Sequence, residues 1–350
     1  MNIFTSQYLP VFNFIPPVLK LVIIDKESNT PIYKQIIECI EQAIISKRLF
    51  RNDRLPSVNK ICMENQVSRD TVLLAYDVLK KKGIIQAIPA KGYYVRTEDF
   101  TYEKRYFLLF DELNSFKEDL LNSFLKGIGK KGHVDIFFHH FNYSMFRKLI
   151  KDNTGNYNKY IIMPGNVEAI EPFLESLAKD DVYIIDQMRD TLKQYPGIYQ
   201  NFVKDIFEAM TSYSQVLQKY NHFIIVFPGE KEPIDMVNGF VKYCETFHKN
   251  YSIISGFQRH SFRKGQMFLI PDDRQLVQAV EKCKEKKLKL GTDIGIISYN
   301  ETPLKKVVEE GITTLSTDFS SMGKRLAEMV IKNEKVQIEN PSKLYLRKSL

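Results

Sequence analysis

Eight short apolar runs, separated by segments with helical periodicity, limit what this chain can fold into more than any other feature of its sequence. Each run has the length of a single strand, and most are apolar on both faces. Buried strands that alternate with helices predict a parallel sheet covered by helices on both sides. The runs begin near residue 105 and lie in a stretch of about 250 residues, enough for two α/β lobes. They are Tyr106–Phe110, Val134–Phe138, Tyr160–Met163, Val182–Ile185, Phe223–Phe227, Ile253–Phe257, Met267–Ile270 and Ile294–Tyr299.

The sequence before these runs has a different pattern, in which helical periodicity comes first and two short strands follow. Isoleucines at helical spacing predict a first helix that starts with Pro31, because a proline costs nothing in the first turn. Two shorter helices follow, with Ser57 and Ser68 placed as N-caps, and then two short strands around a turn. The predicted elements are helices at Pro31–Lys47, Ser57–Glu64 and Ser68–Lys82 and a hairpin of Ile84–Ile88 with Tyr93–Arg96.

The positive charge of the chain is concentrated in this first region. The composition, 44% hydrophobic and 26% charged, is that of a soluble globular protein, and it excludes a disordered tail or a fibre. The net charge is +8, and residues 30–97 alone hold 12 Lys and Arg against 6 Asp and Glu. A local excess of this kind favours a polyanionic partner.

The sequence also suggests where the domains begin and end. We expect a loose N-terminal arm over residues 1–18, a first domain over 19–97 that holds the three helices and the hairpin, a polar linker over 98–104 and a larger domain over 105–350. The apolar start lacks a basic region and is broken by Pro10, Pro16 and Pro17, which argues against a signal peptide. No run approaches the roughly 20 apolar residues that span a bilayer.

Four separated cysteines without a C-x-x-C pair are typical of reduced thiols, so we expect a cytoplasmic protein.

Two helices joined by a short turn can place the second helix in the DNA major groove, and a basic hairpin behind them can act as a wing. In the helix Ser68–Lys82, Val72, Ala75, Tyr76 and Leu79 would face the core, while Ser68, Arg69, Asp70, Thr71 and Leu73 would point outward. Arg69 could reach a phosphate or bond bidentately to guanine. Solvated surface charge is the alternative for any one residue, so the prediction depends on the whole set.

Four stretches of this region carry a family resemblance: P-I-Y-K-Q-I (31–36), L-P-S-V-N-K-I (55–61), V-S-R-D-T-V-L-L-A-Y-D-V-L-K-K-K-G-I-I (67–85) and A-K-G-Y-Y-V (90–95). Together they resemble a GntR-type winged helix-turn-helix. The resemblance implies contacts to double-stranded operator DNA from Arg54, Ser57, Ser68, Arg69, Thr71, Lys91 and Gly92. Two positions depart from the pattern. Asn59 stands where the family often has a base-contacting Arg, and Asp70 adds an acid beside Arg69.

The C-terminal region carries a second resemblance, in D-I-G-I-I-S-Y-N-E-T-P-L (293–304), G-I-T-T-L-S-T-D-F-S-S-M-G-K-R-L-A (311–327) and L-R-K-S (346–349). These stretches are similar to the effector domain of LacI-type repressors, a relative of periplasmic sugar-binding proteins. A GntR-type reader joined to such a sensor resembles arabinose-repressor-like regulators. The resemblance implies a two-lobed, parallel α/β effector domain after a winged helix, with no cofactor and no enzymatic activity.

Polar residues that follow the predicted strands are the candidates for effector binding. Ligands of open α/β sheets sit at the carboxyl ends of the strands, where hydroxyl groups of a monosaccharide would find acceptors and donors. A solvated loop or a helix cap is the alternative for each residue. Met236 stands where the family usually clamps the sugar with Arg, and Arg189 is a possible substitute. The candidates are Asp111, Asn114, Phe116, Asp186, Arg189, Asp272 and Asn300, with the surface around Asp111, Phe116 and His139 as second choice.

Other motifs do not predict chemistry. The G-x-G-x-x-G match at 127–132 closes a helix instead of following a strand, so it indicates a helix stop. His139 and His140 would point to opposite faces of a strand, which disfavours metal binding. No hydrolase elbow, zinc-binding H-E-x-x-H or P-loop motif is present, so we expect no catalytic and no metal-binding residues.

The sequence therefore predicts a ligand-responsive transcription regulator. We expect a homodimer that represses sugar-utilisation genes and is relieved by a monosaccharide such as arabinose or fucose. Two alternatives stay open. One is a sensor for a non-sugar metabolite, and the other is the same DNA reader fused to an enzyme-like domain that binds pyridoxal phosphate.

Overall fold

The structure, a computed structural model, describes residues 20–28, 30–98, 104–229 and 231–350. The chain forms two compact units that divide at residue 101. The predicted arm of residues 1–18 lies outside the described residues, as do residues 99–103 of the predicted linker.

The first unit has the predicted order of three helices and a hairpin. Ser57 and Ser68 cap the second and third helices as predicted. Val72, Ala75, Tyr76 and Leu79 are buried, so the predicted core face of the third helix is confirmed. Leu73 is half-buried against this core, where the sequence predicted an outward position. The elements are α1 (Ile32–Ile45), α2 (Val58–Asn65), α3 (Arg69–Lys81), β1 (Ile85–Ile88) and β2 (Gly92–Val95).

The second unit contains two six-stranded sheets, and each forms the centre of a lobe. Lobe 1 has the strand order β13-β7-β6-β5-β3-β4, and all its pairs are parallel. Its elements are β3 (Lys104–Phe110), α4 (Ser115–Ile128), β4 (Gly132–Phe138), α5 (Tyr143–Asn153), β5 (Lys159–Ile162), α6 (Glu171–Leu174), β6 (Val182–Asp186), β7 (Gly197–Tyr199), α12 (Phe319–Lys332) and β13 (Gln337–Glu339).

Lobe 2 has the order β14-β12-β11-β10-β8-β9, with only β14 antiparallel to its neighbour. The strand predicted at Ile253–Phe257 instead ends at Ile254, and Phe257 fills the core from the loop that follows. The elements are α7 (Phe202–Ser212), α8 (Ser214–Leu217), β8 (His222–Val226), α9 (Asp235–Thr246), β9 (Asn250–Ile254), β10 (Gln266–Ile270), α10 (Asp273–Glu285), β11 (Ile294–Tyr299), α11 (Pro303–Val307), β12 (Thr313–Thr317) and β14 (Ser342–Tyr345).

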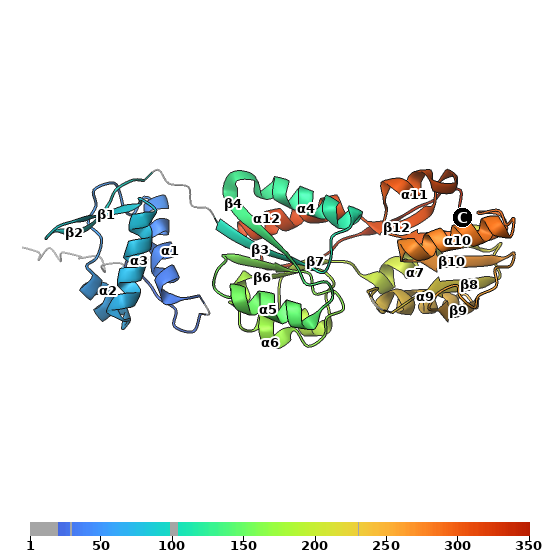
Figure 1. Ribbon diagram of the computed structural model, residues 1–350, viewed down its shortest axis with the longest axis horizontal. Helices are drawn as coiled ribbons and strands as arrows, with labels where there is room; N and C mark the ends of the chain where they lie inside the picture. The colour runs from blue at the N-terminus through green and yellow to red at the C-terminus, as the bar shows by residue number, and fades with distance from the viewer. Residues whose placement is uncertain (1–19, 29, 99–103, 230) are drawn as a thin grey trace, which may run out of the picture. The chain divides into compact units, whose positions relative to one another are not determined.

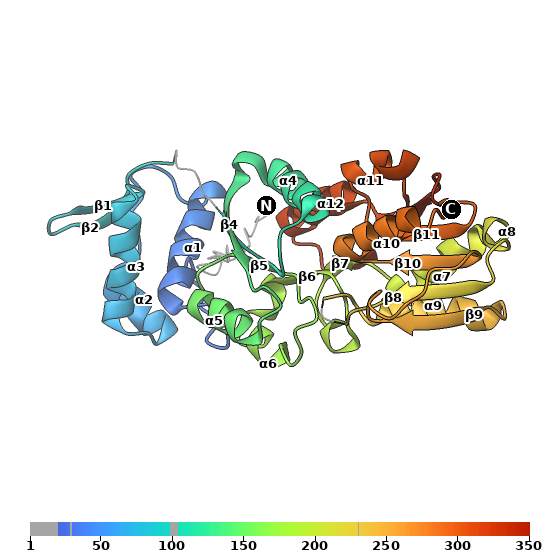
Figure 2. The same ribbon diagram turned by 45° about the vertical axis from the view of Figure 1, so that its right-hand side comes forward.

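Helices cover both faces of each sheet, which explains why the strands are apolar on both sides. In lobe 1, α4 and α12 lie side by side on one face and α5 and α6 cover the other (Figures 1 and 2). In lobe 2, α7 and α9 pack together on one face and α10 covers the other. The predicted doubly covered parallel sheets in two lobes are therefore confirmed.

The chain passes between the lobes three times, after β7, after β12 and after β13. Asn340 ties these crossovers together. Its backbone N–H donates to the Tyr199 carbonyl at 2.7 Å, and its side-chain Nδ2 donates to Thr317 Oγ1 at 2.6 Å. The three connections therefore form one hydrogen-bonded hinge.

Helix α12 follows a strand of lobe 2 but packs on α4 of lobe 1. Glycines permit the close approach of the two helices. A Cβ on Gly323 would lie 2.2 Å from the Leu120 carbonyl oxygen, and one on Gly127 would lie 2.5 Å from the Ala327 Cβ. Because no side chain fits at either position, the two helices are locked at the distance their backbones allow.

Asp205, near the start of α7, is a buried acid beside the hinge. Ser342 Oγ donates to its Oδ2 at 2.8 Å. Burial raises the pKa of Asp205 from 3.8 to about 6, with Glu339 adding to the rise while the Ser342 hydrogen bond and Lys204 oppose it. The folded protein therefore holds this proton at pH values at which the unfolded chain has lost it.

We predict that Asp205→Asn is increasingly stabilising relative to wild type as the pH rises. Between about pH 4 and pH 6, Asp205 is ionised in the unfolded chain but still protonated in the folded chain. The free energy of unfolding of the wild type therefore falls as the pH rises through this range, whereas that of Asp205→Asn does not. The difference should level off above pH 6 at up to about 3 kcal/mol. Urea unfolding between pH 4 and 7.5 measures it, with the exposed Asp119→Asn as control. Parallel pH profiles for wild type and Asp205→Asn would contradict the prediction.

Candidate nucleic-acid interface and effector cleft

The N-terminal end of α3 is open to solvent. Ser68 caps it by accepting a hydrogen bond from the Thr71 N–H at 3.2 Å, and Ser57 caps α2 by accepting from the Lys60 N–H at 3.1 Å. Ser57, Ser68 and Arg69 are exposed, and Thr71 is half-buried. The free N–H groups and partial positive charge of a helix N-terminus favour a phosphate here.

Two arginines and the hairpin extend this surface. The Arg69 Nη1 group donates to Asn59 Oδ1 at 2.5 Å, across the turn between α2 and α3. The backbone of Arg54 forms an isolated antiparallel β-bridge with that of Tyr94. The Arg54 guanidinium lies beside Gly92, 3.7 Å from the position that a Cβ atom on Gly92 would occupy. Lys91, in the hairpin loop, and Gly92, the first residue of β2, are exposed. The structure thus groups Arg54, Lys91 and Gly92 on the wing, while the other four predicted DNA contacts lie at the helix N-termini.

The carboxyl edge of the lobe 1 sheet holds a buried charge cluster. Asp111, which follows β3, is 2% exposed and forms an ion pair with Lys117, which is 6% exposed. Asp186, at the end of β6, is also buried and accepts a hydrogen bond from Gln200 Nε2 at 2.6 Å. Burial raises the pKa of Asp186, Lys117 lowers it, and Asp111 raises it further. The positive charge of Lys117 therefore acts on two carboxyl groups, those of Asp111 and Asp186.

His139 and Phe141 follow β4 at the same edge. His139 is fully buried, and its Nε2–H donates to the Met163 carbonyl at 3.0 Å. Burial lowers the pKa of His139, so the ring is neutral at pH 7. The Phe141 ring lies 6.0 Å from Lys117 Nζ and 5.5 Å from Lys231 Nζ. An aromatic face beside a few polar groups is a common lining of small-molecule sites.

Lobe 2 meets this edge through two contacts. Lys231 pairs with Glu112 at 2.6 Å, and Asn166 Nδ2 donates to the Glu232 carbonyl at 3.0 Å. Asn300, at the end of β11, is fixed through its backbone. Lys305, itself buried, donates to the Asn300 carbonyl at 3.0 Å and to the Tyr299 carbonyl at 2.7 Å. The lobes are thus in contact where both sets of strands end.

Four of the predicted effector contacts have structural partners of their own. Asn114 caps α4 by accepting from the Lys117 N–H at 3.1 Å, and Asp272 caps α10 by accepting from the Gln275 N–H at 2.8 Å. Arg189 Nη2 donates to the carbonyls of Gly165 and Val167 at 2.6 and 2.7 Å. Phe116 is half-buried against Phe319, with ring centroids 4.9 Å apart. Of the predicted set, Asp111 and Asp186 are the ones that the structure brings into one cluster.

Backbone strain collects at the same edge. His140, Phe141, Asp186 and Asn300 all have positive φ angles, between 49° and 72°. Such angles are uncommon outside glycine and persist where the surrounding structure enforces them, often at ligand sites. In lobe 1, His140 and Phe141 follow β4 and Asp186 is the last residue of β6, while in lobe 2 Asn300 directly follows β11.

Sequence reasoning missed Lys117, Phe141 and Lys231. Lys117 had a local signal, because it lies in the first turn of a capped helix, six residues after the strand-end Asp111. Phe141 ends the aromatic stretch F-F-H-H-F. Nothing in the sequence indicates that Lys231 belongs to this site, since it reaches the site only through the ion pair with Glu112 between the lobes. Met236, at the position where the sequence resemblance led us to expect a sugar-clamping Arg, is buried in the core of lobe 2.

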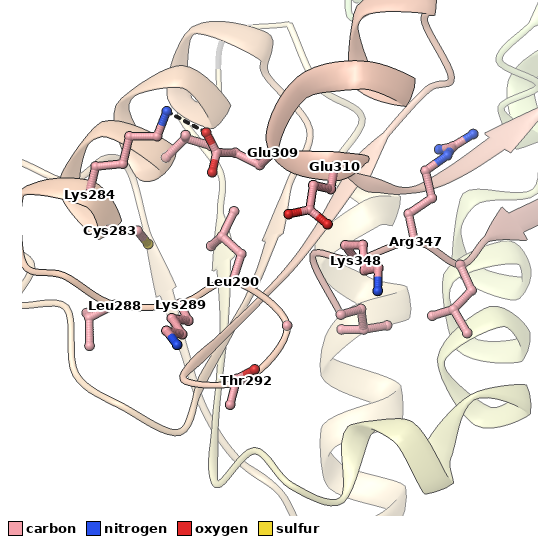
Figure 3. Close-up of a pocket in the computed structure, with 14 residues that line it drawn as sticks. Cys283, Lys284, Leu288, Lys289, Leu290, Thr292, Glu309, Glu310, Arg347 and Lys348 are labelled. Carbon is pink, nitrogen blue, oxygen red and sulfur yellow. Dashed lines mark ion pairs between the residues drawn. The ribbon is translucent and has the colours of Figure 1, made fainter.

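A hollow of about 930 Å³ lies at the opposite edge of the lobe 2 sheet, before β11 and β12 (Figure 3). Lys284 pairs with Glu309 on its rim at 2.5 Å, and Arg347 lines it while binding Glu301 at 2.7 Å. This hollow is not at the carboxyl ends of the strands, so it is separate from the predicted effector site.

Within the described ranges, no three His, Cys, Asp or Glu side chains cluster in a way that could hold a metal ion. In the same part of the chain, no helix combines the length and apolarity needed to cross a membrane.

Comparisons with known proteins match the two units separately. The family of bacterial regulatory proteins of the gntR type matches residues 32–95, and the periplasmic binding protein-like domain matches residues 237–349. The HTH-type transcriptional repressor YtrA of Bacillus subtilis is 33% identical over 75 residues, which cover 21% of this chain and 58% of that protein. The probable rhizopine catabolism regulatory protein MocR of Rhizobium meliloti is 27% identical over 77 residues, which cover 22% of this chain and 16% of that protein. The chain therefore spans less than two thirds of the length of these curated relatives.

Solved structures resemble the larger unit. The trehalose repressor from Escherichia coli superposes with a TM-score of 0.57 at 13% identity, covering 69% of this chain and 100% of that one. A LacI family transcriptional regulator from Silicibacter pomeroyi gives a TM-score of 0.61 at 10% identity, covering 70% and 98%. The transcriptional regulator CelR in complex with cellobiose gives 0.58 at 11% identity, covering 84% and 95%. At these identities the likeness establishes the fold.

We predict that Lys117→Met destabilises the second unit by about 3–5 kcal/mol. The substitution keeps an unbranched side chain of nearly the same length, but it leaves Asp111 buried without a counter-charge and removes the cation near Asp186. Chemical unfolding measures the loss, with Lys126→Met, an exposed position on the same helix, as control. Equal stability of the two variants would show that Lys117 does not neutralise the cluster.

Proposed function

We propose that this chain, which joins a GntR-type winged helix-turn-helix to a periplasmic-binding-protein-like domain, is a transcription regulator that represses sugar-utilisation genes and is relieved by a monosaccharide such as arabinose or fucose. The first unit binds double-stranded operator DNA, and the second binds the effector. Acting on DNA places the protein in the cytoplasm.

The observation that supports DNA binding is the exposed N-terminus of α3 with a cationic wing beside it. Arg69 lies at the helix start, and Arg54 and Lys91 lie at the hairpin. Solvent-exposed cations next to free helix N–H groups favour phosphate, and an Arg at this place can read guanine. The match of residues 32–95 to the gntR family adds to this proposal.

Effector binding is supported by the buried carboxyl cluster at the strand ends of lobe 1. Asp111 and Asp186 offer acceptors for sugar hydroxyls, and Phe141 offers an apolar face. Closure of the lobes about the hinge would bring Asn300 to the same ligand. A ligand shifts the equilibrium only by its differential affinity for the two lobe arrangements, so DNA release depends on that difference.

We further propose a homodimer through the second unit. Exposed apolar side chains on α10 and α11 support this, since Val277, Leu304 and Val307 are 57%, 73% and 71% exposed. The two helices are joined by the Lys305–Asp273 ion pair. A two-fold dimer would present two winged helices to a pseudo-palindromic operator.

Two other classes remain as competitors. A sensor for a non-sugar metabolite is favoured by Met236, which is buried in the core where the family clamps a sugar with Arg. A reader fused to a pyridoxal-phosphate enzyme-like domain is disfavoured, because residues 237–349 match the periplasmic binding protein-like domain. We propose no catalytic residue.

We predict that Arg69→Ala weakens binding to a duplex selected by the full chain from a random library, by about 1–3 kcal/mol. Arg147→Ala, an exposed arginine of the second unit, is the matched control and should bind as wild type does. Fluorescence anisotropy titration at fixed salt measures both. Wild-type affinity in Arg69→Ala would remove this residue from the DNA interface.

We predict that a thermal-shift screen of neutral aldoses and deoxy sugars finds a stabilising ligand, since a ligand at 100 times its Kd stabilises the folded state by about 2.7 kcal/mol. Asp186→Ala and Asn300→Ala should each still bind the selected duplex but need far more of that sugar to release it. Calorimetric titration with unaltered sugar affinity in both variants would place the site elsewhere. A screen in which only non-sugar metabolites stabilise the protein would favour the competing sensor class.

A further inference from the structure

The contact between Asn59 and Arg69 joins the two helices of the helix-turn-helix at its exposed face. Asn59 lies in the first turn of α2, and Arg69 is the first residue of α3. Both side chains are exposed, and the Arg69 Nη1 group donates to the Asn59 Oδ1 atom at 2.5 Å. The contact lies outside the core of the unit, so its main effect is to fix the position of the Arg69 guanidinium.

We propose that Asn59 is a positioning residue for Arg69 and thereby helps to set the base preference of the protein. This inference rests on the proposed DNA-binding function. Asn59 holds the guanidinium by one N–H and leaves the rest of the group to face DNA.

The hydrogen-bond inventory of arginine allows this division. A guanidinium carries five N–H donors, of which Asn59 occupies one on Nη1. The edge formed by Nε and Nη2 stays complete, and such an edge can bond to guanine O6 and N7 together. An unrestrained arginine loses rotamer freedom when it binds, so holding it in the free protein reduces that loss.

The choice of an amide, and not a carboxylate, preserves the charge. A carboxylate at position 59 would also accept from Arg69 but would neutralise its charge and repel the phosphate backbone. Asp70 is an exposed acid next in sequence, yet among the described residues no ion pair joins Arg69 to an acid. Arg69 therefore keeps its full positive charge while its position is fixed.

The experiment uses the full chain and a duplex that wild type selects from a random library. Base preference is measured as the ratio of Kd values for duplexes that differ at one base pair. The proteins are wild type, Asn59→Ala, Arg69→Ala, the double variant and Asn59→Asp. Gln42→Ala, which removes an exposed carboxamide from α1, is the matched control, and thermal unfolding verifies that every variant folds.

We expect Arg69→Ala to abolish the preference for guanine at one position and Asn59→Ala to reduce the same preference about three- to tenfold. In the Arg69→Ala background, Asn59→Ala should have no further effect, because its action passes through Arg69. Asn59→Asp should keep the guanine preference while it lowers affinity for every duplex.

Three results would overturn the proposal. Independent, additive effects of the two substitutions would show that Asn59 does not act through Arg69. A changed preference at a different base pair would make Asn59 a direct reader of its own base. A guanine preference unaltered by Asn59→Ala would leave the contact without a role. Failure of wild type to select any sequence would instead overturn the DNA-binding function itself, together with this inference.

Discussion

The hydrogen bonds of Asn340 hold together the three crossovers between the two lobes of the second unit. This residue links the crossovers after β7, β12 and β13, because it bonds to both Tyr199 and Thr317. Lobe 1 also takes elements from the C-terminal part of the sequence, since α12 packs on lobe 1 directly after a strand of lobe 2. The close contact at Gly323 leaves no slack between α12 and α4. The lobe closure proposed above would therefore be a rotation about this hinge, and it would change the distance between the carboxyl strand ends of the two sheets.

The fold followed from the sequence wherever burial was signalled by apolar residues. Seven of the eight apolar runs lie in strands close to the expected bounds, and the eighth, at 253–257, is displaced toward its N-terminal end. The strand Thr313–Thr317 has no such signal, because four of its five residues are Thr or Ser. Their hydroxyl groups can be buried because they form hydrogen bonds, such as the one that Thr317 Oγ1 donates to the Pro341 carbonyl. Strands β7, β13 and β14 have three or four residues, too few to show a period.

The candidate site was harder to predict, because its chemistry depends on pairing across the sequence. A strand-end acid such as Asp111 is visible in a sequence, but a buried lysine is not expected, since burying an ammonium group is costly unless a partner meets it. Asn114 and Asp272 show the opposite problem. The sequence pattern that places a polar residue after a strand is also the pattern of an N-cap, and the structure uses both residues as caps.

The shared elements of the lobes also determine the order in which the protein can be built on the ribosome. The winged helix is continuous in sequence and can close as soon as its hairpin has emerged. Lobe 1 cannot, because α12 and the edge strand β13 come from residues 319–339, after all but the last strand of lobe 2 has been synthesised. Until then the face of α4 that contains Gly127 lacks its cover. The nascent chain thus carries this uncovered surface until residues 319–339 have emerged, and exposed apolar surface of this kind is where chaperones engage growing chains.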